Sequence, residues 1–121
     1  MTAPFRLAGV LRWRETQHDA ATLEFAAACR DEQALRERLA KLVAEIDELR
    51  NRHRELLRGG RVPAVDLQSH RDYETALRRE LDALREASRR LAEERETRRQ
   101  AVVETHRQVE LLERLRERHV G

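Results

Sequence analysis

The residues best able to take part in chemistry are histidines, and their spacing along the chain matches no known kind of site. The five are His18, His53, His70, His106 and His119. Imidazole nitrogens bind transition metals, but structural zinc sites use four ligands, drawn from short and regular spacings of cysteine and histidine. We therefore interpret these histidines as structural and expect no metal site.

The usual catalytic motifs are also missing from the sequence. Gly59-Gly60 lacks the flanking residues of a phosphate-binding loop or of a dinucleotide fingerprint. Acidic residues are abundant, but the surface of a helix offers no cleft that would shift their pKa values. Cys29 is the single cysteine, which excludes a disulfide within the chain and fits a reducing compartment. We expect no catalytic residues, no cofactor and no small-molecule substrate.

Arginines surround the Gly-Gly pair and raise the question of nucleic acid. Arg52, Arg54, Arg58 and Arg61 lie there, and guanidinium groups bind phosphate well. However, the formal net charge of the chain is only +2, and no aromatic residue stands nearby to stack on bases. We expect a solvated turn and no nucleic-acid partner.

The composition indicates the elements that position these residues. Charged residues make up 40% of the chain and aromatic residues 3%, which leaves little material for a thick globular core. Alanine, leucine, glutamate and arginine dominate, as is typical of long helices and coiled coils. No apolar run approaches membrane-spanning length, and the first residues are too polar for a secretory signal. These features predict a soluble, cytoplasmic, helical protein.

Apolar residues recur with a heptad spacing in both halves of the chain, which is the pattern of a coiled coil. The first half carries Leu7, Ala21, Ala28, Leu35, Leu42, Leu49 and Leu56, with Leu11, Phe25, Leu39 and Ile46 in the companion positions. The second half carries Leu77, Leu84, Leu91 and Leu112, with Leu67, Leu81, Val102 and Val109. Each half therefore predicts one long helix with a two-position seam.

The strongest helix breakers stand between the two halves. Gly59 and Gly60 favour a helix end, Pro63 disfavours helical geometry at the residue before it, and Asp66 or Ser69 could cap a new helix. We predict a first helix over about residues 4–58, a turn at 59–65 and a second helix over about 66–119. The expected fold is all-α, a single domain formed by a long antiparallel two-helix coiled-coil hairpin.

The hairpin predicts a register in which the numbers of facing residues add up to 123. Its facing pairs include Leu11 with Leu112, Ala21 with Val102, Leu39 with Leu84, Leu42 with Leu81, Ile46 with Leu77, Leu56 with Leu67, His18 with Thr105 and His53 with His70. Near the termini, Phe25 would face Arg98 and Ala28 would face Arg95. Because these layers bury less apolar surface, we expect the terminal half to be less stable than the half near the turn.

Several apolar residues lie outside the seam, and most of them gather near the two ends of the chain. They are Phe5, Val10, Trp13 and Leu23 in the first half, and Val103, Leu111 and Leu115 in the second. An exposed tryptophan often anchors an interface. Two interpretations remain open, since these residues could bind a partner or could simply cover the end of the hairpin.

Three short stretches of the sequence resemble the flagellar export protein FliJ family. The opening FRLAGVLRWRE, residues 5–15, is similar to the Phe-x-Leu-x-x-Val-Leu-x-x-Arg with which that family begins. The stretch RDYETAL, residues 71–77, resembles its Tyr-x-x-x-Leu, and ERLRER, residues 113–118, resembles its closing segment. This chain is shorter than many members and carries arginine where they carry lysine.

The resemblance implies a non-catalytic stalk protein of the flagellar type III export apparatus, folded as an antiparallel two-helix coiled coil. It implies association with the export ATPase and its regulator, with the membrane export gate protein and with export chaperones. It also implies a peripheral position at the cytoplasmic face of the inner membrane. By this analogy the ATPase contacts would be Phe5, Leu7, Leu11, Trp13, Leu111 and Leu115, and the gate or chaperone contacts would be Tyr73 and Leu77.

Two alternative functions remain open at this point. Stalk proteins of virulence-type III secretion systems share the same layout. A generic coiled-coil adaptor or a homodimeric tether, unrelated to secretion, would also show these heptads.

Overall fold

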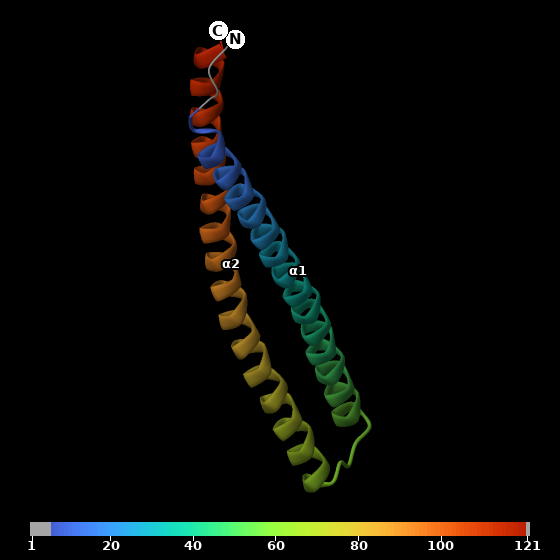
Figure 1. Ribbon diagram of the computed structural model, residues 1–121. Helices are drawn as coiled ribbons and strands as arrows, with labels where there is room; N and C mark the ends of the chain where they lie inside the picture. Colours follow the sequence, from blue (N-terminus) through green and yellow to red (C-terminus); the bar gives the residue numbers. More distant parts are fainter. Residues whose placement is uncertain (1–5, 121) are drawn as a thin grey trace. The chain divides into compact units, whose positions relative to one another are not determined.

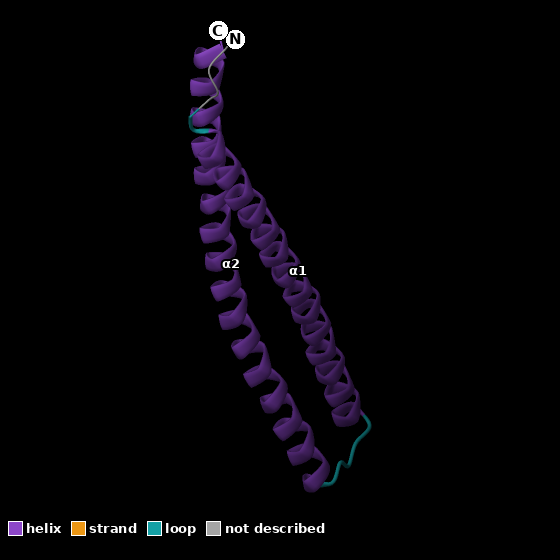
Figure 2. Cartoon of the chain, in the orientation of Figure 1, coloured by secondary structure: helices purple, strands orange, loops and turns teal. Residues whose placement is uncertain are grey.

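The computed structural model describes residues 6–120, which form two long helices and no strand. Helix α1 spans Ala8–Arg58 and helix α2 spans Ala64–Val120 (Figures 1 and 2). The two helices run antiparallel and pack against each other, so the predicted all-α helical hairpin is confirmed. Within the described residues, neither helix contains the long apolar stretch that a membrane crossing requires.

The turn shows why α1 stops and α2 starts. The amide of Gly59 still donates to the carbonyl of Glu55, at 3.1 Å, but Gly60 adopts a φ of 101°, which leaves the helical path. Beyond it, the carbonyl of Pro63 accepts hydrogen bonds from the amides of Asp66 and Leu67, at 3.0 and 3.2 Å.

The new helix begins at Ala64, whereas its start is predicted at about residue 66, and the carbonyl of Pro63 accepts its first intrahelical hydrogen bonds. Asp66 lies in the first turn of α2, where a carboxylate is favoured by the helix dipole. At the other end of the chain, Arg6 and Leu7 form a turn before α1, whereas the first helix was predicted from about residue 4.

The contacts between the helices divide the chain into two units. We call residues 32–90 the turn unit, and residues 6–31 together with 91–120 the terminal unit. In the turn unit, Leu42, Ile46, Leu49 and Leu77 form a buried cluster against which Leu81 and Leu84 pack. These residues come alternately from the predicted seam positions of both helices.

The terminal unit has a thinner core. Its buried apolar residues are Leu11, Ala21, Ala28 and Val109, so small alanines stand where the turn unit has leucines. Arg98, predicted to face Phe25, directs its guanidinium to the carboxylate of Glu24 at 2.7 Å. Its charged head is thus kept outside the seam, as a snorkelling arginine requires.

The predicted register is confirmed in each unit by a pair of polar residues. In the terminal unit, Nδ1 of His18 lies 3.0 Å from the hydroxyl of Thr105. In the turn unit, the rings of His53 and His70 lie 5.6 Å apart. In both pairs the two residue numbers add up to 123, as predicted. The same register therefore holds in each unit.

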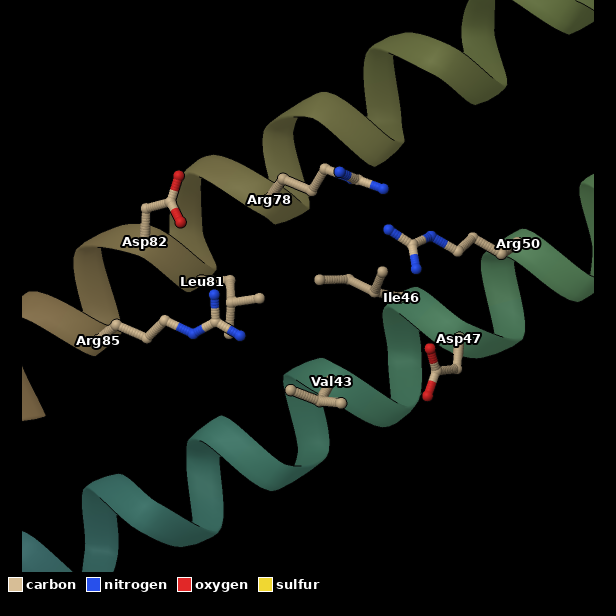
Figure 3. Close-up of a pocket in the computed structure, with 8 residues that line it drawn as sticks. All are labelled: Val43, Ile46, Asp47, Arg50, Arg78, Leu81, Asp82 and Arg85. Atoms are coloured by element: carbon tan, nitrogen blue, oxygen red, sulfur yellow. The ribbon is translucent and has the colours of Figure 1, made fainter.

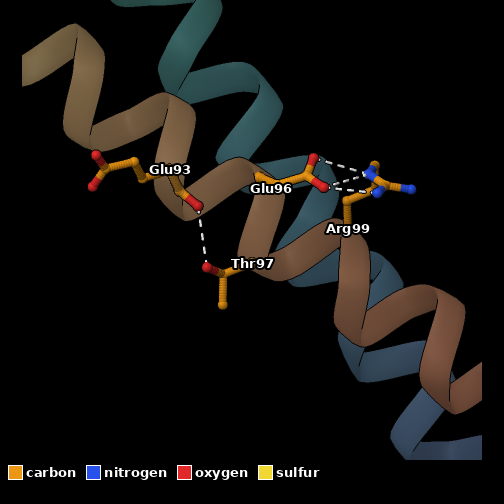
Figure 4. Close-up of polar contacts among 4 residues, drawn as sticks. All are labelled: Glu93, Glu96, Thr97 and Arg99. Atoms are coloured by element: carbon orange, nitrogen blue, oxygen red, sulfur yellow. Dashed lines mark hydrogen bonds and ion pairs between the residues drawn. The ribbon is translucent and has the colours of Figure 1, made fainter.

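Ion pairs between neighbouring turns cover the outer faces of the helices. Arg99 binds both carboxylate oxygens of Glu96, with its Nη2 at 2.7 Å and its Nε at 2.9 Å, and Thr97 donates to the carbonyl of Glu93 (Figure 4). The hydrogen bond from Arg99 lowers the pKa of Glu96, and the hydrogen bond to Glu96 raises the pKa of Arg99. Such exposed pairs support single helices and add little to the packing between them.

Candidate partner-binding site

One flank of the terminal unit presents apolar side chains from both helices. Arg14 donates to Gln17 at 3.4 Å and to Gln108 at 2.7 Å, so these three residues lie on the same flank of the helix pair. Val10 lies one heptad before Gln17, and Leu115 lies one heptad after Gln108.

Trp13 and Leu111 complete this flank, three residues after Val10 and Gln108 respectively. All four apolar side chains are exposed. We call the set formed by Val10, Trp13, Leu111 and Leu115 the terminal apolar surface.

Trp13 is the largest member of the terminal apolar surface. Its side chain is 53% exposed, and the guanidinium carbon of Arg14 lies 4.7 Å from the centre of its ring. A cation above the indole face holds the ring in place without covering its outer side. Trp13 is thus a large aromatic side chain that is fixed in position, half-exposed and next to aliphatic side chains. Such residues are typical anchors of protein–protein interfaces.

The structure separates the predicted contact residues into two kinds. Trp13, Leu111 and Leu115 are exposed, and Leu7 is partly exposed in the turn before α1. Leu11 is only 3% exposed and Leu77 only 6% exposed, so both belong to the seam between the helices. They support a surface from behind, and a partner could reach them only if the helices separated. Phe5 lies outside the described residues.

Tyr73 marks a second surface, in the turn unit. Its hydroxyl donates to the carboxylate of Glu45 on the opposite helix at 2.9 Å, and its ring is half-exposed. The hydrogen bond to Glu45 and the negative charge of the same carboxylate raise the pKa of Tyr73. A cavity of about 240 Å³ lies beside the ring and is lined by Glu45, Glu48, Leu49, Arg52 and Tyr73.

Four of the five histidines pair across the helices. His18 lies 5.5 Å from His106 in the terminal unit, and His53 lies 5.6 Å from His70 in the turn unit, both measured between ring centres. Within residues 6–120, no three histidine, cysteine or acidic side chains gather closely enough to hold a metal ion.

Two features of the turn unit were not expected from the sequence. Glu32, a polar interruption of the seam, is buried and forms an ion pair with Arg36 one turn later. A cavity of about 280 Å³ opens between the helices beside Val43, and arginines line its rim (Figure 3). One feature of the sequence could have pointed to this cavity: Val43 is apolar but stands directly after the seam position Leu42, outside the seam.

The comparisons with known proteins identify one family. The family model described as "Flagellar FliJ protein" matches residues 3–120, which is nearly the whole chain. The match includes both described helices and all four residues of the terminal apolar surface. Searches of curated proteins and of solved structures find no significant match.

Proposed function

The chain belongs to the FliJ family of flagellar proteins, and from this premise we propose that it is a non-catalytic component of the flagellar type III export apparatus that binds the export ATPase through its terminal unit. The same proposal places it at the cytoplasmic face of the inner membrane, as a peripheral protein held there by the apparatus. Its other proposed partners are the regulator of the ATPase, the membrane export gate protein and the export chaperones.

The observation that carries the ATPase contact is the terminal apolar surface. Val10 and Trp13 from α1 lie on the same flank as Leu111 and Leu115 from α2, and all four are exposed. Exposing a tryptophan and three aliphatic side chains together is unfavourable in water, and a partner that covers them recovers that free energy. The thin core of the terminal unit supports the same proposal, because a bound partner would add the packing that its alanine layers lack.

Each predicted residue has a distinct part in this proposal. Trp13, Leu111 and Leu115 contact the ATPase directly, with Leu7 and Phe5 extending the contact toward the start of the chain. Leu11 acts from behind, by holding the two helices together under the surface. In the turn unit, Tyr73 contacts the gate protein or a chaperone, and Leu77 supports it from the seam.

The test is a binding measurement with the purified export ATPase. Replacing Trp13 and Leu115 by serine in one variant should weaken association by at least about tenfold, since buried aromatic anchors dominate interface energies. The matched control is Leu23→Ser, which changes an equally apolar and more exposed residue of the same unit outside the surface. The control should bind like the unchanged chain.

Circular dichroism of each variant separates loss of binding from loss of folding. Unchanged ATPase binding by the folded Trp13→Ser/Leu115→Ser variant would refute the assignment. An equal loss of ATPase binding in this variant and in Leu23→Ser would refute the assignment as well. Binding would then not depend on which flank of the terminal unit is changed.

A separate measurement tests the turn-unit contact. Tyr73→Ser should weaken binding to the export gate protein or to export chaperones, while binding to the ATPase stays unchanged. If Tyr73→Ser leaves both the gate and the chaperone associations intact, Tyr73 has no part in either.

A further inference from the structure

The two flanks of the turn unit carry different charge. The cavity near Val43 identifies one flank, since α1 contributes Val43, Asp47 and Arg50 to it and α2 contributes Arg78, Asp82 and Arg85. Residues one heptad away lie on the same flank, because seven residues are close to two helical turns. We call this set the basic flank, and its charged members are Arg36, Arg50, Arg54, Arg71, Arg78, Arg85, Arg89, Asp47 and Asp82.

The opposite flank carries acidic and basic side chains in nearly equal numbers. Arg38 binds Glu80 at 3.0 Å there, and Tyr73 binds Glu45. By the same heptad spacing this flank holds Arg38, Lys41, Arg52 and Arg90 against Glu45, Glu48, Glu55, Asp66 and Glu80. The basic flank carries seven arginines and two aspartates, whereas the opposite flank carries four basic and five acidic side chains, so the positive charge of the turn unit is concentrated on the basic flank.

Of the seven arginines on the basic flank, Arg36 and Arg89 each pair with a glutamate on their own helix, two others share one carboxylate, and three form no ion pair. Arg50 and Arg78 share the single carboxylate of Glu74, at 2.9 and 3.3 Å. Within the described residues, Arg54, Arg71 and Arg85 form no ion pair, and all three are exposed. Guanidinium groups that are exposed and not already paired are available to bind carboxylates in the two-pronged geometry that arginine favours.

The cavity adds an apolar element to this charged flank. Ile46 and Leu81 lie between the helices at its floor, Val43 stands exposed at its edge, and the guanidinium groups of Arg50 and Arg78 extend toward each other across it (Figure 3). A bare polyanion would match the arginines but would gain nothing from the apolar floor. A ligand that matches both must carry apolar and acidic groups side by side.

We propose that the basic flank is a docking surface for an acidic amphipathic helix of a partner protein, which inserts an apolar side chain at Val43, Ile46 and Leu81 and places carboxylates on Arg71 and Arg85. Docking of a third helix against a helix pair uses the same heptad packing that joins the pair itself. The carboxylates set the orientation and the choice of partner, while the apolar contact contributes affinity. This surface is separate from the terminal apolar surface and from the face that carries Tyr73.

The probe is a designed helical peptide with leucines on one face and glutamates beside them, labelled for fluorescence anisotropy and added to the full chain. The expected result is saturable binding that weakens as salt is added. Arg71→Glu/Arg85→Glu should weaken it by about tenfold or more, because two attractive rim contacts become repulsive. Neither arginine has an ion pair to lose, so folding should be unaffected.

Three controls make the test specific. Lys41→Glu/Arg90→Glu changes the net charge by the same amount on the opposite flank and should bind the peptide nearly as the unchanged chain does. Val43→Ser keeps every charge and should still weaken binding. A peptide of the same composition with scrambled order, so that its leucines no longer share a face, should bind poorly.

Several results would overturn the proposal. Equal binding of the ordered and scrambled peptides, or equal losses in the two charge-reversal variants, would show only general attraction between opposite charges. Binding to phosphatidylglycerol vesicles or to duplex DNA that depends on Arg71 and Arg85, without binding to the peptide, would assign the flank to a membrane or a nucleic acid. A dimer in sedimentation that Arg71→Glu/Arg85→Glu dissociates would assign it to a second copy of this chain.

Discussion

His18 and Thr105 share a hydrogen bond across the terminal unit, with Nδ1 of the ring 3.0 Å from the hydroxyl oxygen. The hydroxyl oxygen of Thr105 also lies 2.7 Å from the carbonyl oxygen of Ala101 in its own helix. Its single hydrogen serves either this carbonyl or the imidazole, according to which ring nitrogen of His18 carries a hydrogen. A polar layer with both partners satisfied can remain inside a seam without opening it, and it fixes which residues face each other.

The buried leucines of the turn unit should dominate its stability. Leu42→Ala removes a side chain that is 5% exposed, and we expect the free energy of unfolding to fall by about 2–3 kcal/mol. The same change at Leu23, which is 72% exposed, should alter it by less than about 0.5 kcal/mol. Urea unfolding followed by circular dichroism measures both. Similar effects of the two substitutions would contradict the burial described here.

The two units should differ in local stability. The terminal unit buries two alanines where the turn unit buries leucines, so it gains less free energy from packing per layer. Hydrogen exchange followed by mass spectrometry should show faster exchange for residues 15–30 and 92–105 than for residues 40–50 and 74–84. Equal protection of these segments in the free protein would show that the polar and alanine layers are as stable as the leucine layers.

The two glycines of the turn should differ in how well they tolerate substitution by alanine. Gly60 has a φ of 101°, a conformation that L-residues rarely adopt, so Gly60→Ala should lower the free energy of unfolding by about 1 kcal/mol. At Gly59 an added Cβ would lie 3.6 Å from its nearest neighbour, which is ordinary contact. Gly59→Ala is therefore the matched control and should be close to neutral. Thermal unfolding of the two variants measures the difference. An equal loss of stability in Gly59→Ala and Gly60→Ala would contradict the turn geometry.

The ionisation of Tyr73 should report on the contact between the helices. Its pKa is raised by the hydrogen bond to Glu45, so Glu45→Gln should lower the pKa of Tyr73 toward its usual value. Because Tyr73 is the single tyrosine, the ultraviolet absorbance of tyrosinate measures it without interference. An unchanged titration in Glu45→Gln would mean that Tyr73 and Glu45 are apart in solution.

The raised pKa of Tyr73 also fixes the direction of the pH effect on stability. The folded state binds the phenolic proton more tightly than the unfolded state does. The stabilisation is therefore fully present below the pKa of the unfolded chain and is lost as pH rises through the folded pKa. The difference in stability between the unchanged chain and Tyr73→Phe should accordingly shrink in alkaline solution. A difference that grows with pH would contradict this sign.

The heptad pattern predicts the pairing of the helices because each side chain of the seam has a partner fixed by helical geometry. Leu42 and Ile46 are found in the core for that reason, and the Gly-Gly pair ends α1 at Arg58. The start of α2 lies two residues before the predicted residue 66, since a search for a capping side chain misses a helix whose first residue directly follows Pro63.

The candidate site was less accessible to sequence reasoning. Leu11 and Leu77 were expected in partner contacts by analogy with the family, yet both lie on the seam and are buried. Trp13 stands outside the seam, and its exposure followed from that position. The basic flank required the structure, because Arg50 and Arg85 are far apart in sequence and only the pairing of the helices places them beside one cavity.

The central claim is that the two helices of a single chain pair in the register of His18 with Thr105, which gives Trp13 and Leu115 a common flank. Disulfide trapping tests it directly in a chain with Cys29→Ala and cysteines at positions 18 and 105. We predict rapid oxidation to a disulfide within one chain, and much slower oxidation when the second cysteine is moved one heptad to position 112. Cross-linking between two chains, or preferential trapping of 18 with 112, would contradict the account.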